Sequence, residues 1–189
     1  MMEFLIVLGV IVLILVVVIG VYNSLVAKRQ TCNQGWADID AALRQRHDLV
    51  PNLVDSVKGY AAHEAGVLTA VIAARAGALN MRSPQAAAKA EAALSGAIGS
   101  LMALAENYPD LKASANFQAL QGELADVEDK IAASRRAYNA AAADFNTARE
   151  SFPAVLFAGA LGFSQREFWE LEDGDRARMD AAPAIRFGG

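Results

Sequence analysis

The chain is poor in the residues on which most catalytic and metal sites depend. It has one cysteine and two histidines among 189 residues, so it cannot form an intramolecular disulfide and offers few metal ligands. Neither histidine begins an H-E-x-x-H sequence, and neither follows a glutamate by three residues, as a di-iron bundle requires. The sequences G-x-S-x-G and G-x-x-x-x-G-K are also absent. We therefore expect no enzyme: no catalytic residue, no cofactor and no metal site.

The histidines and the cysteine have structural interpretations. His47 and His63 are sixteen positions apart, roughly 24 Å along one helix, so they cannot share a metal ion within one chain. Hydrogen bonding between helices explains both, and a metal-dependent or proton-linked role, as an enzyme or sensor, is the remote alternative. Cys32 has no histidine near it in sequence and is interpreted as a structural thiol.

Acidic residues outnumber basic ones, 21 to 17. The formal net charge is −4, so we expect no basic surface and no nucleic acid as a partner. Aromatic residues make up only 7%, alanine is abundant, and β-branched residues become rare after the first segment. This composition favours an all-α fold in which amphipathic helices pack closely.

The sequence does contain one long apolar run. Residues 4–21 contain no charged side chain and are about as long as a helix that crosses a bilayer. The prediction is an N-terminal membrane anchor over residues 1–27, with a cleaved signal sequence or a buried core helix as alternatives. Positions along the expected span include Phe4, Leu8, Leu13, Val18 and Val21.

The charges that flank this run predict its orientation. Glu3 precedes it, whereas Lys28, Arg29, Arg44 and Arg46 follow it. The positive-inside rule then places the C-terminal part in the cytoplasm, with a single pass through the membrane.

Residues 28–150 predict a bundle of long helices. The first apolar stripe proceeds in steps of three and four, with Arg46 and Glu64 in its two gaps. Its members are Trp36, Ile39, Leu43, Val50, Leu53, Val57, Tyr60, Val67 and Val71. Pro51 interrupts it, so the helix either kinks there or restarts with Asp48 as its N-cap. The unbroken phase favours a kink and one helix from the span to about Ala78.

Two further helices follow. Ser83 and Pro84 form a helix-start signature, and the second helix ends at Pro109. Its expected stripe is Ala87, Ala90, Leu94, Ala97, Leu101, Leu104 and Tyr108. The third begins near Ser114, and its stripe is Phe117, Leu120, Leu124, Val127, Ile131, Ser134, Tyr138, Ala141 and Phe145. Alternating steps of three and four predict coiled-coil-like packing within the bundle or with other copies.

Residues 151–189 form a separate C-terminal region. Residues 152–163 are uncharged but too short to span a bilayer. This segment either closes one end of the bundle or contacts the membrane surface or a neighbouring subunit. The candidate contact residues are Phe152, Pro153, Leu156, Phe157, Phe163, Phe168 and Trp169. Residues 170–175 are acidic and are expected to form part of a mobile tail.

Several segments together resemble the LemA family of bacterial membrane proteins. They are Tyr22–Val26, Trp36–Asp40, Arg46–Val54, Val57–Glu64, Glu106–Ala113, Asn116–Phe117, Arg135–Asn139, Phe145–Asn146 and Ser151–Pro153. The chain departs from the family's usual pattern at Gly35, where alanine is usual, and at Phe145, where tyrosine is common. Because the segments occur in the family's order along most of the chain, the resemblance is specific.

The resemblance implies an antiparallel bundle beyond the span, with a cytoplasmic C-terminal part and no established biochemical activity. Its motif residues are interpreted as fixing the register of the bundle, with a ligand or partner surface as the alternative. They are Trp36, Asp40, Arg46, His47, Asp48, Pro51, Asn52, Lys58, Tyr60, His63, Tyr108, Lys112, Phe117, Arg135, Tyr138, Asn139 and Asn146.

Two functions remain in competition. The first is a scaffold that self-assembles as a homo-oligomer on the lipid bilayer and organises the membrane or its protein partners. Similarity of the family to a magnetosome-membrane protein points in this direction. The second is an adaptor for another membrane protein, either a membrane protease or a TPM-type partner, because family members often lie genetically beside these.

Overall fold

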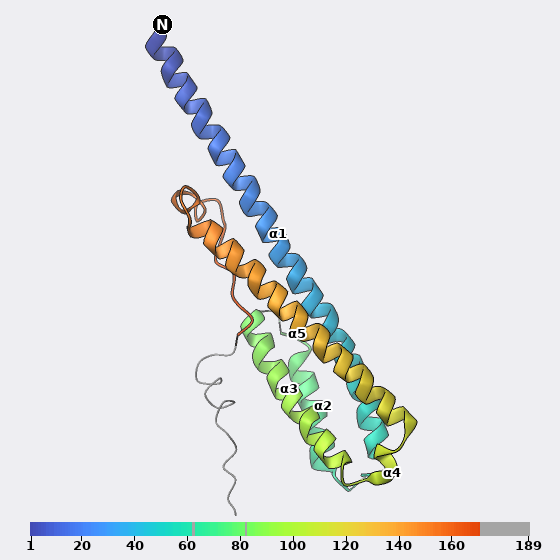
Figure 1. Ribbon diagram of the computed structural model, residues 1–189. Helices are drawn as coiled ribbons and strands as arrows, with labels where there is room; N and C mark the ends of the chain where they lie inside the picture. The colour runs from blue at the N-terminus through green and yellow to red at the C-terminus, as the bar shows by residue number, and fades with distance from the viewer. Residues whose placement is uncertain (62, 82, 171–189) are drawn as a thin grey trace, which may run out of the picture. The chain divides into compact units, whose positions relative to one another are not determined.

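The computed structural model describes residues 1–61, 63–81 and 83–170, and the acidic segment expected after Glu170 lies outside them. Within these ranges the chain forms five α-helices and a short 3-10 helix, as predicted for an all-α protein (Figure 1). The α-helices are α1 (Met2–Lys58), α2 (Ala65–Ala78), α3 (Pro84–Ala105), α4 (Pro109–Lys112) and α5 (Ala115–Glu150), and the 3-10 helix spans Ala154–Leu156.

Helix α1 contains both the apolar run and the first part of the bundle. It passes Val21 and Pro51 without a break, which excludes a new helix capped by Asp48. The expected extension to Ala78 is wrong, because α1 ends at Lys58 and Gly59 begins a turn. Glycine is a poor helix former, which accounts for the end of α1 at this point. Helix α2 then packs Leu68 and Val71 into the same core as α1, so the apolar spacing continues beyond the turn.

The other boundaries follow local chemistry. The Ser83 hydroxyl accepts a hydrogen bond from the Ala86 amide at 3.3 Å, and Pro84 occupies the first turn of α3, as predicted. The Ser114 hydroxyl likewise accepts from the Phe117 amide at 3.2 Å at the start of α5. Helix α3 ends at Ala105, before the expected Pro109, because Pro109 begins the separate short helix α4.

The chain divides into two compact units, which are considered separately. Unit 1 comprises Met1–Leu43 and Asp129–Glu167, and the described residues of unit 2 are Arg44–Glu128, apart from 62 and 82, and 168–170. Both α1 and α5 contribute residues to each unit.

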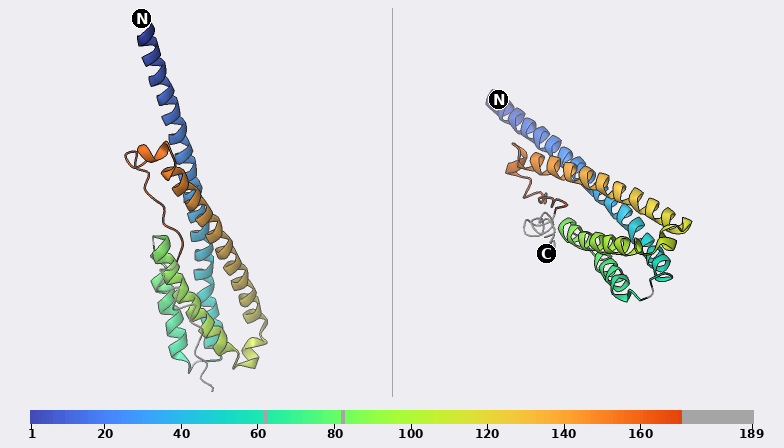
Figure 2. Two further views of the ribbon diagram at one scale, coloured as in Figure 1. Left: turned by 60° about the vertical axis from the view of Figure 1, so that its left-hand side comes forward. Right: turned by 60° about the horizontal axis from the view of Figure 1, so that its bottom comes forward.

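Unit 2 contains the larger core. Its segments of α1, α2, α3 and α5 alternate in direction and enclose apolar side chains, which is an antiparallel bundle (Figures 1 and 2). Fully buried members of this core are Val50, Val57, Val71, Leu94, Leu101, Leu111 and Phe117.

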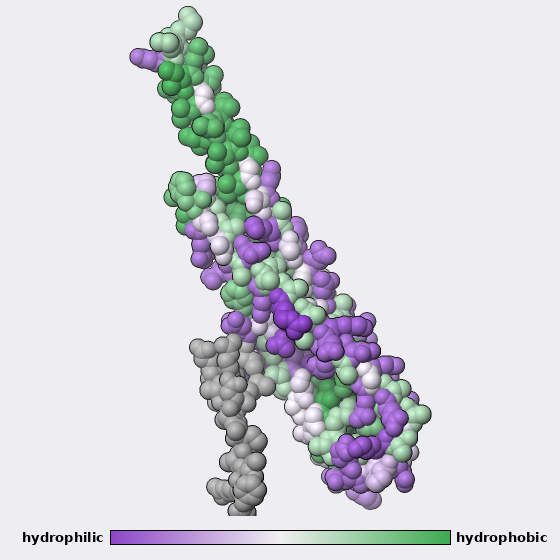
Figure 3. Space-filling model, in the orientation of Figure 1, coloured by the Kyte–Doolittle hydropathy of each residue, from purple (hydrophilic) through white to green (hydrophobic). Residues whose placement is uncertain are grey.

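Unit 1 pairs the first part of α1 with the second part of α5. The segment that follows α5 folds back and packs Ala154, Ala158 and Phe163 against Leu25, Cys32 and Phe145. Residues 4–17 of α1 are all exposed, and they form the continuous hydrophobic column of Figure 3. By length and composition, α1 can cross a membrane.

Candidate functional site

Three ionisable side chains, those of Arg46, His47 and Glu91, are buried together in unit 2. Arg46 forms an ion pair with Glu91, and His47 Nε2 lies 2.7 Å from Glu91 Oε1. Arg46 Nη1 also donates to Glu128 Oε1 at 2.7 Å and to Ser95 Oγ at 2.8 Å. These residues come from α1, α3 and α5, so the network ties three helices together.

The centre of the network is closed to solvent, although the Arg46 Nε has no hydrogen-bond partner among the described residues and the Glu128 side chain is 42% exposed. Arg46 is only 1% exposed, and its Nη2 also donates to the Glu91 carbonyl at 3.3 Å. Both oxygens of the Glu91 carboxylate face cations or the His47 ring. Buried ion pairs of this kind add little net stability, but breaking one costs about 3–5 kcal/mol. The arrangement therefore specifies which residues of α1, α3 and α5 face each other.

Pro51 creates a second polar feature of α1. Proline has no amide hydrogen, so the His47 carbonyl, four residues earlier, loses its helical hydrogen bond. Arg75 of α2 donates its Nε–H to this carbonyl at 2.7 Å. The side chain of one helix thus supplies the donor that proline removed from another, which explains how α1 continues through residue 51.

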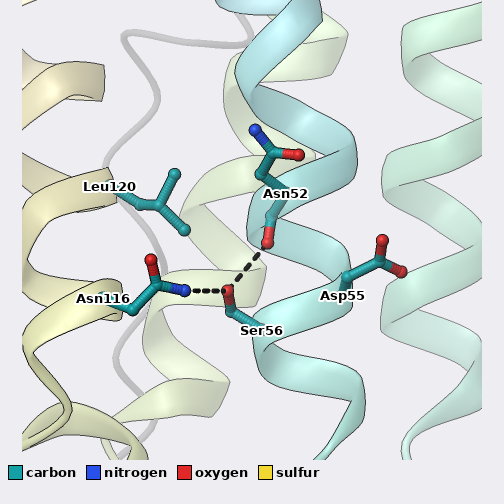
Figure 4. Close-up of a pocket in the computed structure, with 5 residues that line it drawn as sticks. All are labelled: Asn52, Asp55, Ser56, Asn116 and Leu120. Carbon is teal, nitrogen blue, oxygen red and sulfur yellow. Dashed lines mark hydrogen bonds between the residues drawn. The ribbon is translucent and has the colours of Figure 1, made fainter.

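An open groove on unit 2 is lined by Asn52, Asp55, Ser56, Asn116 and Leu120 (Figure 4). Asn116 Nδ2 donates to Ser56 Oγ at 3.3 Å, and Ser56 Oγ donates to the Asn52 carbonyl at 2.8 Å. The groove contains amides, a hydroxyl and one carboxylate, which can bind through hydrogen bonds. It lacks the paired nucleophile and base that covalent chemistry requires.

In unit 1, α1 and α5 approach closely at Gly35. A Cβ atom at Gly35 would lie 3.2 Å from the Tyr138 Cα, a tighter contact than such atoms usually make. The ring of the next residue, Trp36, lies 5.8 Å from the Tyr138 ring, measured between centroids. The absence of a side chain at Gly35 therefore permits close approach of the two backbones.

Two side chains of α5 hold the segment that follows it. Asn146 Nδ2 donates to the Arg166 carbonyl at 2.9 Å, and the Arg166 amide donates to Asn146 Oδ1 at 2.8 Å. The Tyr138 hydroxyl donates to the Glu167 carbonyl at 2.8 Å. Burial raises the pKa of Tyr138, partly opposed by the positive charge of Arg166, so the hydroxyl stays protonated and able to donate.

Cys32 is buried in the same unit. Its thiol lies 3.2 Å from the Ala141 carbonyl. Burial raises the pKa of Cys32, and the charge of Arg166 offsets this only in part. Because the thiolate is the reactive form, the environment of Cys32 suits a structural thiol.

The remaining predicted residues are distributed over both units. Phe4, Leu8 and Leu13 are exposed on α1, whereas Val18 and Val21 are half-buried. Phe117 is buried, Tyr108 precedes α4, and Lys112 pairs with Glu106 on the surface. Exposed positions are Asp48, Pro51, Asn52, Lys58, Tyr60, His63 and Arg135, and half-buried ones are Trp36, Asp40 and Asn139.

The C-terminal candidates fall into two groups. Phe152 and Leu156 are exposed, whereas Phe163 and Trp169 are buried. Pro153, Phe157 and Phe168 are intermediate.

Sequence reasoning missed the partners of Arg46 and of His47. Glu91 lies between Ala87 and Leu94 at helical spacing, so a carboxylate on an apolar face was the available signal. Arg75 carried no comparable signal. Among the described residues, no three histidine, cysteine, aspartate or glutamate side chains are grouped to bind a metal ion.

An exposed apolar helix that continues into a helical bundle, whose buried charges are paired with one another, is the fold of a membrane-associated helical protein. The comparisons place it more closely: the chain belongs to the LemA family, whose sequence model matches residues 35–187.

Several relatives are informative. The chain is 25% identical to Protein LemA of Metamycoplasma hominis over 167 residues, covering 88% of this chain and 76% of that protein. It is also 25% identical to Magnetosome protein MamQ of Magnetospirillum gryphiswaldense over 174 residues, covering 78% of this chain. That match spans 64% of MamQ. Magnetosome protein MamQ 2 of Paramagnetospirillum magneticum is 32% identical over 81 residues, which are 43% of this chain and 30% of that protein.

Proposed function

We propose that this protein is a membrane-anchored scaffold that self-assembles and organises the membrane or its protein partners without catalysis. The observation that carries the proposal is that one helix, α1, has two roles. It contains the exposed apolar residues 4–17, and further along it supplies core residues of unit 2. The anchor therefore leads directly into the helical domain. Relatives named as magnetosome proteins support a role at membranes.

The proposed location is the inner membrane of a bacterium, with a single pass and a cytoplasmic helical domain. Lys28 and Arg29 follow the apolar residues of α1 within two turns, whereas Glu3 precedes them. Cations close to a span are retained preferentially on the cytoplasmic side.

Helix α2 offers a surface for self-assembly. Its only charged residue is Arg75, which is bonded to the His47 carbonyl. The solvent-facing side is small or apolar over the whole helix, and Ile72 is 55% exposed. The exposed members of this α2 face are Ala65, Gly66, Thr69, Ala70, Ile72, Ala73, Ala76 and Gly77. Small residues let two helices approach closely, and an exposed isoleucine gains from burial.

Native mass spectrometry of the detergent-extracted protein tests the proposal. Assembly predicts masses at multiples of the 20.0 kDa chain at micromolar concentration. Ile72→Arg should shift the distribution toward the single chain, whereas Ala119→Arg, at an exposed position of α5, should leave it unchanged. A strictly monomeric native protein would refute self-assembly.

The polar groove of Figure 4 favours the adaptor as a second candidate. Its amides and single carboxylate suit an extended peptide of another membrane protein, which could bind through backbone hydrogen bonds. Photo-crosslinking from position 52 in membranes should capture one partner, and Asp55→Lys should abolish the capture. Equal capture by the native and substituted proteins would argue against the groove.

A further inference from the structure

The segment after α5 presents an unpaired apolar surface beside the exit of the apolar helix. Four large side chains of this segment face solvent: Phe152 (79% exposed), Val155 (54%), Leu156 (72%) and Leu161 (43%). No charged residue occurs from Phe152 to Gln165. We call these four side chains the loop patch.

The opposite side of the same segment is fixed to unit 1. The Phe163 ring lies 5.5 Å from the Tyr22 ring and 6.3 Å from the Phe145 ring, measured between centroids. Arg149 Nε donates to the Phe163 carbonyl at 2.8 Å. Gly162 has a φ of 76°, a conformation that favours glycine, and the Phe163 amide closes this turn by donating to the Ala158 carbonyl at 3.0 Å. The segment is therefore held in place, and its apolar residues are divided into a buried side and an exposed side.

The position of this segment along α1 matches the edge of a bilayer. Residues 4–21 rise about 27 Å, close to the roughly 30 Å thickness of the hydrocarbon core. Val21, Leu25 and Val26 of α1 pack against the segment, so it begins where the hydrocarbon would end. Figure 3 shows the hydrophobic column of α1 beside this part of unit 1.

Cations lie at the next level of α1. Lys28 and Arg29 are about 10 Å beyond Val21 along the helix, at the depth of lipid phosphates and water. The Arg29 guanidinium lies 5.1 Å from the centroid of the Phe163 ring. Apolar side chains at the hydrocarbon boundary with cations just outside it form the arrangement typical of interfacial anchors.

We propose that the loop patch inserts into the bilayer at the boundary between acyl chains and headgroups, as a second membrane contact beside the α1 span. The patch braces unit 1 against the membrane at the point where α1 leaves it. This inference rests on the insertion of α1 but not on self-assembly.

Spin-label accessibility in nanodiscs tests this contact. The full-length protein with Cys32→Ala carries one nitroxide at Phe152→Cys, Leu156→Cys, Leu13→Cys or Ala143→Cys. The discs contain equal parts phosphatidylcholine and phosphatidylglycerol and hold one protein copy each. Oxygen concentrates in the bilayer and a nickel chelate in water, so their accessibility ratio reports depth.

The ratio at positions 152 and 156 should be several-fold higher than at 143, which is exposed on α5, and closer to the ratio at 13. Nickel accessibility at 152 and 156 equal to that at 143 would overturn the proposal. A second preparation, with several copies in each disc, serves as a comparison: protection at 152 and 156 in these discs alone would also overturn the proposal, because a second copy would then cover the patch. A low oxygen-to-nickel accessibility ratio at position 13 would mean that α1 itself had failed to insert. The label at 13 therefore distinguishes failure of the α1 span from failure of the loop patch alone.

Discussion

Replacing Pro51 should make Arg75 dispensable. The proline leaves the His47 carbonyl without its helical donor, and Arg75 Nε supplies one at 2.7 Å. Arg75→Met keeps most of the side-chain volume but removes this donor. Hydrogen bonds to charged groups contribute about 1.5–3 kcal/mol, so we expect Arg75→Met to lower the free energy of unfolding by that amount.

Pro51→Ala restores the amide hydrogen to α1. Because Pro51 is exposed and lies inside the helix, the substitution should itself raise the free energy of unfolding, by up to ~3 kcal/mol. In this background the His47 carbonyl has a helical donor, and Arg75→Met should cost about 1–2 kcal/mol less than in the native chain. The evidence that Arg75 replaces the missing amide donor is therefore the difference between the cost of Arg75→Met in the two backgrounds, rather than the effect of either single substitution.

Urea unfolding in detergent, followed by far-UV circular dichroism, measures all four proteins of this cycle. Arg136→Met, which removes an exposed arginine of α5, serves as the control and should have the same small effect with either residue at position 51. A cost of Arg75→Met that is equal in both backgrounds, within ~0.5 kcal/mol, would refute the reasoning.

Three further outcomes follow from the described contacts. Glu91→Gln should lower the free energy of unfolding by about 3–5 kcal/mol, because it leaves Arg46 buried and underpaired, whereas Glu106→Gln, in an exposed pair, should cost at most ~1 kcal/mol. Gly35→Leu should destabilise the protein by about 1–3 kcal/mol through overpacking, whereas Gly35→Ala should be nearly neutral, because its helix-propensity gain offsets the 3.2 Å contact. Cys32→Ala should lose less stability than the native protein as pH rises past the usual thiol range in urea titrations.

Controls for these outcomes are internal to each comparison. If Glu91→Gln lowered the free energy of unfolding no more than Glu106→Gln does, the buried network would not contribute to stability. Equal costs for the two Gly35 variants would argue against close helix approach. For Cys32 the sign follows from its raised pKa: the folded state keeps the proton, so this contribution is complete below the unfolded pKa and disappears as pH rises through the folded pKa. Matching alkaline profiles for the native and Cys32→Ala proteins would contradict it.

The helical architecture could be predicted from periodicity because its signals are local. The third stripe is buried at Phe117, Leu124, Ile131, Tyr138 and Phe145, as expected from steps of three and four. The start of α3 could be predicted equally well, because Ser83 and Pro84 act on neighbouring backbone atoms.

Contacts between helices were less accessible to sequence reasoning. The buried face of α3 includes Ala88, Glu91 and Ile98, each one residue beyond a member of the expected stripe. Alanine is so frequent in α3 that apolar content alone does not define one face. Arg46 did occupy a gap in the first stripe, and that gap is buried, but periodicity cannot tell which carboxylate on another helix compensates the charge.

The turn at Gly59 and the fold of residues 151–167 depend on packing rather than on local propensity. A heptad phase continues through a turn when the next helix returns to the same core, as α2 does, so phase cannot distinguish one helix from two. Likewise, an uncharged stretch gives no hint of which residues are buried. The division between Phe163 and the loop patch arises from the turn at Gly162 and the hydrogen bond from Arg149.

The two hydrogen bonds of Asn146 restrict which side chains can replace it. Its amide donates to and accepts from the Arg166 peptide group, so it imitates one rung of a β-ladder inside a helical protein. Aspartate has the same shape but would set a second lone-pair oxygen against the Arg166 carbonyl. Leucine would match neither polar group. Slow deamidation of this single asparagine would therefore convert a two-point attachment into a repulsive one without any change in volume.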